Sequence, residues 1–495
     1  MPRSVVRLRS VETLYTQDIM AINTESKSRA ACALVISTLV LLGGCAPSLA
    51  SQVSTVGSLA RVRDLALLHE GEVEPDSSAA AIKLLKQPVN ADAAVRIALL
   101  NNRELRAQLR ELGISAGQLI TAGLVANPTF EVEFLPERDS KYELRAEYDL
   151  TSLIMAPLRR AAAQADVEAA RLSAAGAVVD LGYQVRVRFY ALQATTQRLA
   201  LAQQSLDALA ASRDAARALL DAGNIKPLDA ASQIAAYERA RVDVARMELE
   251  VAERREAVQR VLGLYGQQTT WEVKNALPSE SERLPMVDDL ERRALEANLD
   301  LRAAHKRLDG LAKQSGITST RAWLPEVVGD VHALRVKDED GGRDVWRWGA
   351  GFSVQVPLFD RAQGRLQGIA SQFDAALERY QGLAVNLRSA ARDARNRLVS
   401  THARARQYQT VILPAQRVVL EQTLLQYNAM QIGVFQLISA RRELFDVELA
   451  YVDMLRDFWS AMAEVDALGQ GRVVRVAEAT NANTFTASTG ADGGH

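Results

Sequence analysis

The chain has 495 residues, enough for two or three ordinary domains. Apolar residues make up 48% of it, which excludes a wholly disordered protein. The 59 basic and 60 acidic residues nearly cancel, so the basic excess typical of a nucleic-acid-binding protein is missing. The only two cysteines are Cys32 and Cys45, which excludes a disulfide scaffold and a cysteine-rich metal site.

The first 44 residues have the pattern of a secretory signal. Lys27 and Arg29 precede a short apolar stretch at 31–42, and Leu-Gly-Gly then leads to Cys45. This ending resembles the lipobox of bacterial lipoproteins, in which cleavage before the cysteine accompanies its lipidation. We therefore expect a signal peptide at 1–44, with Met20 as an alternative start, and a lipid anchor on Cys45. The alternative is a buried apolar helix with a chance cysteine.

The rest of the chain contains one unit twice. Residues 98–107 align with 294–303, Asn127-Pro128 with Leu324-Pro325, Pro157-Leu158 with Pro357-Leu358, and 222–225 with 429–432. Four landmarks in one order indicate a duplicated domain, because solenoid repeats are much shorter. The predicted divisions are a lipidated linker at 45–89, repeats at 90–262 and 286–469, an equatorial linker at 263–285 and a disordered tail at 470–495.

Each repeat has the pattern of helix, strand, strand, helix, helix, so the fold class is mostly α with a small β part. The first helices are expected at 91–123 and 288–322. Apolar and polar residues then alternate with period two, most clearly over 346–356, which predicts strands. Long helices are expected at 158–221 and 360–427, about 96 Å and about 102 Å long, and Pro414 should kink the second.

One protomer cannot bury such elements alone. Val185, Leu192, Leu199 and Leu206 recur at heptad spacing, which favours side-by-side packing of the long helices in a tube. A sheet of four strands has open edges that need partners. Closing it into a barrel would take several copies of the chain.

Together these features resemble the TolC-type outer-membrane efflux proteins, in their lipoprotein branch. The resemblance covers about residues 90–469 and rests on the duplicated unit and on the motifs at 354–360, Gly364-Arg365 and 427–444. It implies a homotrimer with a 12-stranded outer-membrane β-barrel that continues into a periplasmic helical coiled-coil tunnel. The implied partners are a periplasmic adaptor protein, an inner-membrane pump of the RND type and outer-membrane lipid.

The implied function is a passive exit duct for small solutes, either drugs or metal cations, in a tripartite efflux system. Two alternatives remain: the outer-membrane channel of a type I protein secretion system, and a lipid-anchored periplasmic scaffold without a pore. The five histidines form no metal-binding spacing, and no phosphate loop or nucleophile elbow occurs. We therefore expect no enzyme activity, no cofactor, no metal site and no nucleic-acid partner.

Three groups of residues are candidates for function, and each has a simpler interpretation. Carboxylates and one arginine are expected on the lumen side of a barrel, or merely on a wet face: Glu131, Glu133, Glu143, Glu147, Asp149 and Arg347. Aromatic residues are expected on the lipid side, or in an ordinary core: Tyr148, Trp346, Trp348 and Phe352. Hairpin residues are expected at a periplasmic tip that contacts the adaptor, or in solvated loops: Asp221, Gly223, Asn224, Asp229, Met430, Gln431 and Gly433.

Overall fold

The computed structural model describes residues 49–61, 74–134, 140–274, 276–279, 284, 287–337 and 344–474. These residues belong to one compact unit. Cys45 and the segment before it lie outside the described residues, so lipidation stays a prediction. Residues 475–495, the greater part of the expected tail, also lie outside them.

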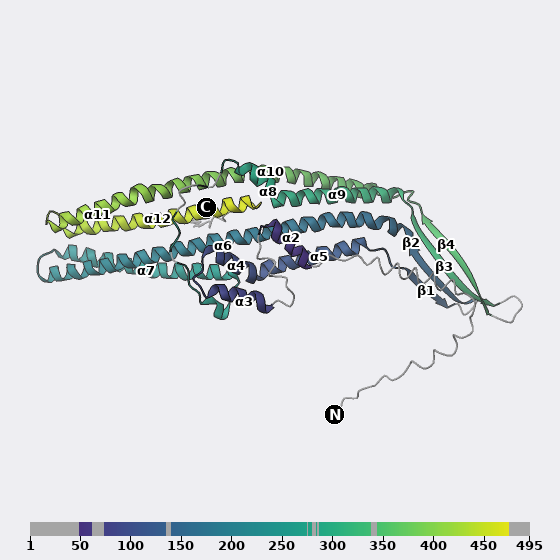
Figure 1. Ribbon diagram of the computed structural model, residues 1–495, viewed down its shortest axis with the longest axis horizontal. Coiled ribbons are helices and arrows are strands. Elements are labelled where there is room, and N and C mark those ends of the chain that lie inside the picture. The colour runs from purple at the N-terminus through teal and green to yellow at the C-terminus, as the bar shows by residue number, and fades with distance from the viewer. Residues whose placement is uncertain are drawn as a thin grey trace, which may run out of the picture. The chain divides into compact units, whose positions relative to one another are not determined.

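The chain repeats one order of elements twice, as the sequence predicts. Two short helices come first, α2 (Leu49–Leu59) and α3 (Glu74–Leu85). The first copy comprises α4 (Ala91–Asn101), α5 (Arg103–Gly123), β1 (Thr129–Phe134), β2 (Ser140–Asp149), α6 (Leu150–Asp221) and α7 (Pro227–Leu262). The second comprises α8 (Leu290–Ala297), α9 (Leu299–Trp323), β3 (Glu326–Lys337), β4 (Asp344–Gln355), α10 (Gln363–Gln407), the π-helical turn η3 (Tyr408–Ile412), α11 (Leu413–Asn428) and α12 (Val434–Gly469). The mostly helical fold with a small sheet is confirmed (Figure 1).

The first helix of each copy is broken, whereas the sequence predicted it to be continuous. The breaks fall at Asn102 and Asn298, which are equivalent positions in the two repeats. Both residues have an extended backbone, and each side-chain oxygen accepts a hydrogen bond from the backbone three residues on. The bond from Leu105 N to Asn102 measures 2.9 Å, and that from Leu301 N to Asn298 measures 2.7 Å. An asparagine that caps a new helix therefore ends the preceding one.

The long helices also differ from expectation at their ends. Helix α6 begins at Leu150 instead of Leu158 and continues through Pro157. The Asp149 side chain caps it by accepting a 3.1 Å hydrogen bond from Ser152 N. In the second copy, α10 begins only at Gln363, after Ala362 adopts a left-handed backbone.

A π-helical turn precedes Pro414, where the sequence predicts a kink; the kink itself stays a prediction. Helix α10 ends at Gln407, and the turn η3 separates it from α11, which has Pro414 in its first turn. Proline cannot donate a backbone hydrogen bond, and its ring crowds the carbonyl one turn earlier. A locally widened turn before the proline accommodates both effects.

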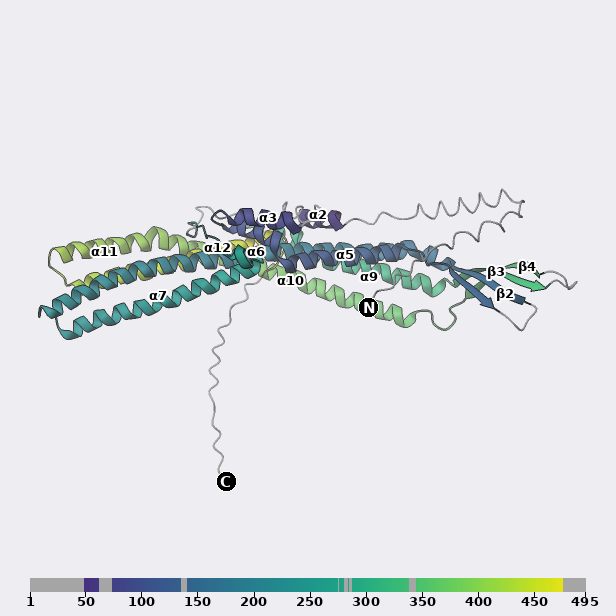
Figure 2. The same ribbon diagram turned by 90° about the horizontal axis from the view of Figure 1, so that it is seen from below.

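The four strands form one antiparallel sheet in the order β1-β2-β3-β4. The β2–β3 pair joins the two copies, for example by pairing Arg145 with His332. Strands β1 and β4 are the edges within this chain. The sheet lies at one end of α5, α6 and α9, and the hairpins α6–α7 and α11–α12 turn at the opposite end (Figure 1 and Figure 2).

The core lies in the middle of the helices. The largest apolar cluster holds Phe189 and Leu192 of α6 against Trp271, which stacks on Phe189 with ring centroids 6.4 Å apart. A second cluster places Phe458 of α12 against Leu398 of α10. The linker between the copies accepts hydrogen bonds from α6 of the first copy and from α12 of the second. Gln193 of α6 donates to Lys274 O at 3.0 Å, and the indole of Trp459 donates to Pro278 O at 2.8 Å.

Candidate functional site

One face of the sheet carries the charged residues that the sequence singled out. The register pairs Glu131 with Arg145, and Glu133 with Glu143. Arg145 forms ion pairs with Glu143 at 2.9 Å and with Glu147 at 3.7 Å. The structure therefore brings these acidic residues together around one arginine. Their position on the lumen side of a barrel stays a prediction.

Asp149 and Arg347 share this face with them. Arg347 pairs with Leu334, which in turn pairs with Glu143. Asp149 pairs with Val328 at the sheet end that leads into α6. Its carboxylate caps that helix, a structural role that the sequence analysis did not assign.

Two further polar residues on this face were missed. His332 Nδ1 lies 2.9 Å from the Asp330 carboxylate, and both belong to β3. Their side chains lie over Gly349 and Gly351 of β4, where any added Cβ would collide with them. The glycines in the sequence of β4 were the available signal, because a strand glycine often marks a close approach of this kind.

The opposite face is mostly apolar and exposed in this chain, and the ion pair of Arg335 with Asp344 lies on it beside Trp346. Trp348 is 77% exposed and Phe352 is 78% exposed. Trp346 lies on the same face, because alternate residues of a strand share a face. Tyr148 of β2 lies there too, because Gly329 of β3 pairs with both Tyr148 and Phe352. All four predicted aromatic residues thus occupy one face. Contact of that face with lipid stays a prediction.

The two hairpin turns have the same backbone geometry. Gly223 has φ +71° and Met430 has φ +57°, both in the left-handed region. At the first turn Gly223 N donates to Leu220 O at 2.9 Å, and Asn224 N donates to Leu219 O at 2.8 Å. This pair of bonds is the Schellman motif that ends a helix.

The second turn repeats the motif. Met430 N donates to Tyr427 O at 2.9 Å, and Gln431 N donates to Gln426 O at 3.0 Å. Gly433 N donates to the side chain of Gln436 at 2.8 Å at the start of α12.

The remaining predicted tip residues lie around these turns. Asp221 is the last residue of α6 and is exposed, as is Asn224. Asp229 is half-buried in the first turn of α7, where its negative charge complements the helix dipole. Contact of these turns with an adaptor stays a prediction.

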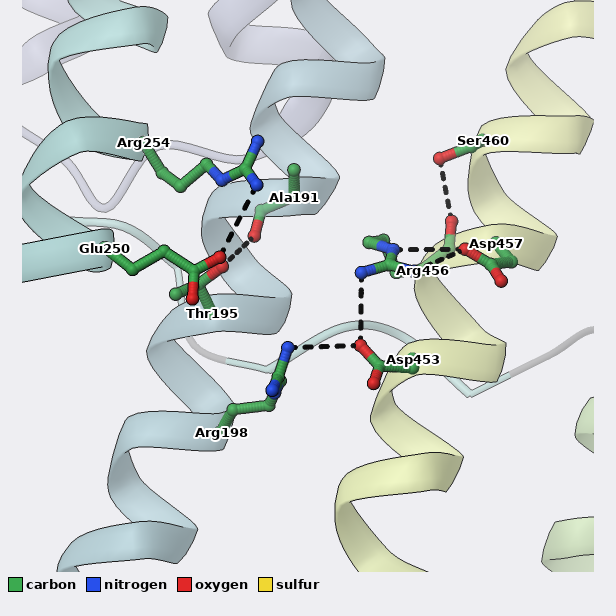
Figure 3. Close-up of polar contacts among 9 residues, drawn as sticks. All are labelled: Ala191, Thr195, Arg198, Glu250, Arg254, Asp453, Arg456, Asp457 and Ser460. Atoms are coloured by element: carbon green, nitrogen blue, oxygen red, sulfur yellow. Dashed lines mark hydrogen bonds and ion pairs between the residues drawn. The ribbon is translucent and has the colours of Figure 1, made fainter. Parts of the chain in front are cut away.

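Figure 3 shows a group of ion pairs on α6, α7 and α12, one of which connects the two copies. Arg198 of α6 lies 3.5 Å from the Asp453 carboxylate of α12. Arg456 binds the same carboxylate at 3.1 Å and Asp457 at 2.8 Å. On α7, Arg254 lies 3.4 Å from Glu250. The spacing of Glu250 and Arg254, and of Asp453 and Arg456, was a usable signal for the pairs within α7 and α12. The pair of Arg198 with Asp453 was beyond prediction, because α6 and α12 are far apart in the chain.

A cavity of about 900 Å³ opens beside this network, between α6, α7, α10 and α12. Five arginines are among its lining residues: Arg188, Arg254, Arg397, Arg404 and Arg456. Three carboxylates are also among them: Glu250, Asp457 and Glu464. Glu464 is only 6% exposed, and burial raises the pKa of its carboxyl although Arg397 opposes the shift.

The segment after α12 is held in place, which corrects the tail predicted to begin at 470. Arg472 binds Asp180 of α6 at 2.8 Å and also binds Asp300 of α9. Leu299 N donates to Gly471 O at 2.8 Å, so this segment also caps α9. Residues 470–474 are therefore part of the folded body, because two half-buried carboxylates fix Arg472.

Two kinds of feature are absent from the described residues. No group of three or more histidine, cysteine or acidic side chains there is placed to hold a metal ion. Among the same residues, no helix has both the length and the apolar character needed to cross a membrane.

The chain is similar to known proteins over most of its length. No protein-family model matches it. It is 26% identical to the cobalt-zinc-cadmium resistance protein CzcC of Cupriavidus metallidurans over 395 residues, which are 77% of this chain and 90% of that protein. Solved structures give the same fold. The fold is that of the TolC-type outer-membrane channels.

Two of those structures illustrate the match. The outer membrane protein VceC of Vibrio cholerae superposes with a TM-score of 0.62 at 15% identity, covering 77% of this chain and 96% of that one. The open state of the outer membrane channel MtrE of Neisseria gonorrhoeae gives 0.57 at 19% identity, covering 77% and 89%. The resemblance to the TolC-type channels is therefore confirmed, whereas the lipoprotein branch stays a prediction.

Proposed function

We propose that the chain is the outer-membrane duct of a tripartite efflux system. Three copies form a barrel in the outer membrane and a helical tunnel through the periplasm. The duct is passive, and an inner-membrane pump of the RND type supplies the energy. A periplasmic adaptor protein connects the pump to the hairpin tips.

The two-faced, open-edged sheet is the observation that carries this proposal. One face has exposed Trp348 and Phe352, and the other has Glu131, Glu143 and Arg145. An apolar outer band with a polar interior is the pattern of a membrane barrel. Three copies of a four-stranded sheet close into twelve strands and leave no unpaired edge. The outer membrane is then the location of the sheet, and Cys45 adds a lipid anchor.

We propose divalent metal cations as the cargo. The relative that spans 77% of this chain is a cobalt-zinc-cadmium resistance protein. The carboxylates on the polar face of the sheet suit a cation path, because a ring of negative side chains lowers the barrier for cations.

The test compares a deletion strain with the same strain carrying the gene on a plasmid. Both are grown on cobalt, zinc and cadmium salts and on a panel of organic drugs. We expect the deletion strain to be more sensitive to the metals only. Sensitivity to drugs alone would reject the metal cargo. A purified protein without ion conductance in a planar bilayer would reject the duct itself.

A further inference from the structure

The cavity between α6, α7, α10 and α12 has more positive than negative charge in its lining. Each of its three carboxylates is matched by a lining arginine. Arg254 lies 3.4 Å from Glu250, Arg397 lies 3.5 Å from Glu464, and Arg456 lies 2.8 Å from Asp457. Two lining arginines, Arg188 and Arg404, remain without an ion pair among the described residues.

Both arginines have N–H groups that the hydrogen bonds among the described residues do not use. Arg188 gives one hydrogen bond to Gln184 at 3.0 Å, and Arg404 gives one to Ser400 O at 3.4 Å. A guanidinium carries five N–H donors, so each keeps several for a ligand. Burial and the nearby charge of Arg260 lower the pKa of Arg188, which means that its positive charge is poorly compensated.

A neutral donor lies in the same lining. Tyr183 is 5% exposed, and its hydroxyl has no hydrogen-bond partner among the described residues. Burial first, and Glu464 second, raise the pKa of Tyr183 to about 12. The hydroxyl therefore keeps its proton at neutral pH and needs an acceptor, since a buried donor without one is costly.

Two positive guanidinium groups and one buried hydroxyl donor call for an anion with several oxygens. We propose that this cavity binds an oxyanion, either phosphate or a carboxylate-bearing solute, through Arg188, Arg404 and Tyr183. A planar guanidinium matches phosphate and carboxylate oxygens with two parallel hydrogen bonds, which a single-atom anion cannot accept in the same way. A cation is disfavoured because five arginines line the cavity against three carboxylates. The site does not depend on the proposed efflux function.

The cavity borders the packed core of α6 at Tyr183, which both lines the cavity and belongs to the largest apolar cluster. The other α6 residues of the lining are Gln184, Val187, Arg188, Ala191 and Thr195. Arg404 lies on α10 outside that cluster, so Arg404→Gln changes the lining without touching the core. Tyr183→Phe removes the hydroxyl but keeps the ring that packs in the core.

The test is isothermal titration calorimetry of the full-length protein, purified from membranes in detergent, with sodium phosphate at constant ionic strength. We expect saturable binding to the wild type. Arg404→Gln and Tyr183→Phe should each weaken it by about tenfold, since each removes a donor to a charged ligand. Glu464→Gln should strengthen it, because a negative charge leaves the lining.

Arg406→Gln is the matched control. Arg404 and Arg406 lie on the same helix and are both exposed, but only Arg404 lines the cavity. Arg406→Gln should leave phosphate binding unchanged. The proposal is overturned if the wild type shows no saturable phosphate binding, or if Arg406→Gln weakens binding as much as Arg404→Gln. Titration with citrate then shows whether a carboxylate-bearing solute binds more tightly than phosphate. Neither measurement requires a pump, so a failure here would leave the efflux proposal standing.

Discussion

Met430 occupies a backbone conformation that favours glycine. Its φ is +57°, and the equivalent residue of the first hairpin is Gly223 at +71°. Left-handed backbone costs a residue with a Cβ roughly 1–2 kcal/mol. Both turns have the same pattern of backbone hydrogen bonds. The strain at Met430 therefore comes from its side chain and not from a difference in turn type.

Replacing Met430 by glycine should stabilise the second hairpin. Relief of about 1–2 kcal/mol of strain outweighs the roughly 0.4–1 kcal/mol that glycine loses through unfolded-state entropy. Hydrogen exchange of the tip amides in the assembled protein would measure the gain. Met430→Ala is the control, because it removes the side chain but keeps the Cβ. Equal protection in the alanine and glycine variants would contradict the strain at this position.

Glu464 should make stability depend on pH. Burial raises the pKa of its carboxyl in the folded state above the ordinary value of 4.5. The folded state therefore binds this proton more readily, and its contribution to stability falls as pH rises from 4.5 through the raised pKa. In Glu464→Gln this loss of stability with rising pH should be absent. The melting temperature of the variant minus that of the wild type should therefore be larger at about pH 8 than at about pH 5. A constant difference between the two pH values would contradict a raised pKa.

At the scale of elements, the two faces of β4 are the sharpest feature. Trp348 is 77% exposed on the apolar face, and Arg347 lies on the polar face beside it in sequence. Strand residues alternate between faces, so neighbouring substitutions test opposite environments.

Trp348→Asp should hinder insertion of the assembled protein into the outer membrane. A carboxylate on a lipid-facing side costs up to about 2 kcal/mol, depending on depth. Arg347→Asp should be tolerated, because that side chain would point into water. Membrane fractionation and crosslinking would compare the two variants. Equal assembly of both would reject the assigned phase of the strand.

The sequence predicted elements where a local pattern carried the information. Alternation from Trp346 to Val356 predicted β4, and the repeat predicted the order of elements. The breaks at Asn102 and Asn298 were missed because the apolar spacing continues across them, although asparagine at equivalent repeat positions was a usable signal. The arginine-lined cavity was beyond prediction, since Arg188 of α6 and Arg404 of α10 come to line one cavity only in the folded chain, where both helices pack against α12.

At the scale of the whole molecule, Arg472 joins the two repeats. It binds Asp180 of the first repeat and Asp300 of the second, and Gly176 of α6 leaves the space that its guanidinium fills. Burial alone would lower the pKa of Arg472, but these carboxylates reverse the effect and raise it. One arginine after the last helix thus balances two acidic residues that would otherwise repel each other.

Truncating the chain from its C-terminus should therefore lower its thermal stability only once Arg472 is removed. Ending the chain after Val474 keeps the ion pairs of Arg472 with Asp180 and Asp300 and should leave the thermal stability unchanged. Ending it after Gly469 removes Arg472 and the cap that Gly471 O gives to Leu299 N. Asp180 and Asp300 then face each other half-buried. We expect the free energy of unfolding to fall by about 1–3 kcal/mol, since the pair is partly screened by solvent.

Arg472→Gln in the full chain separates the loss of the charge from the loss of the cap, because it removes the charge but keeps the cap. Thermal unfolding of the three variants measures them, and a variant ending at Gly469 that melts with the wild type would show that this segment does not join the repeats.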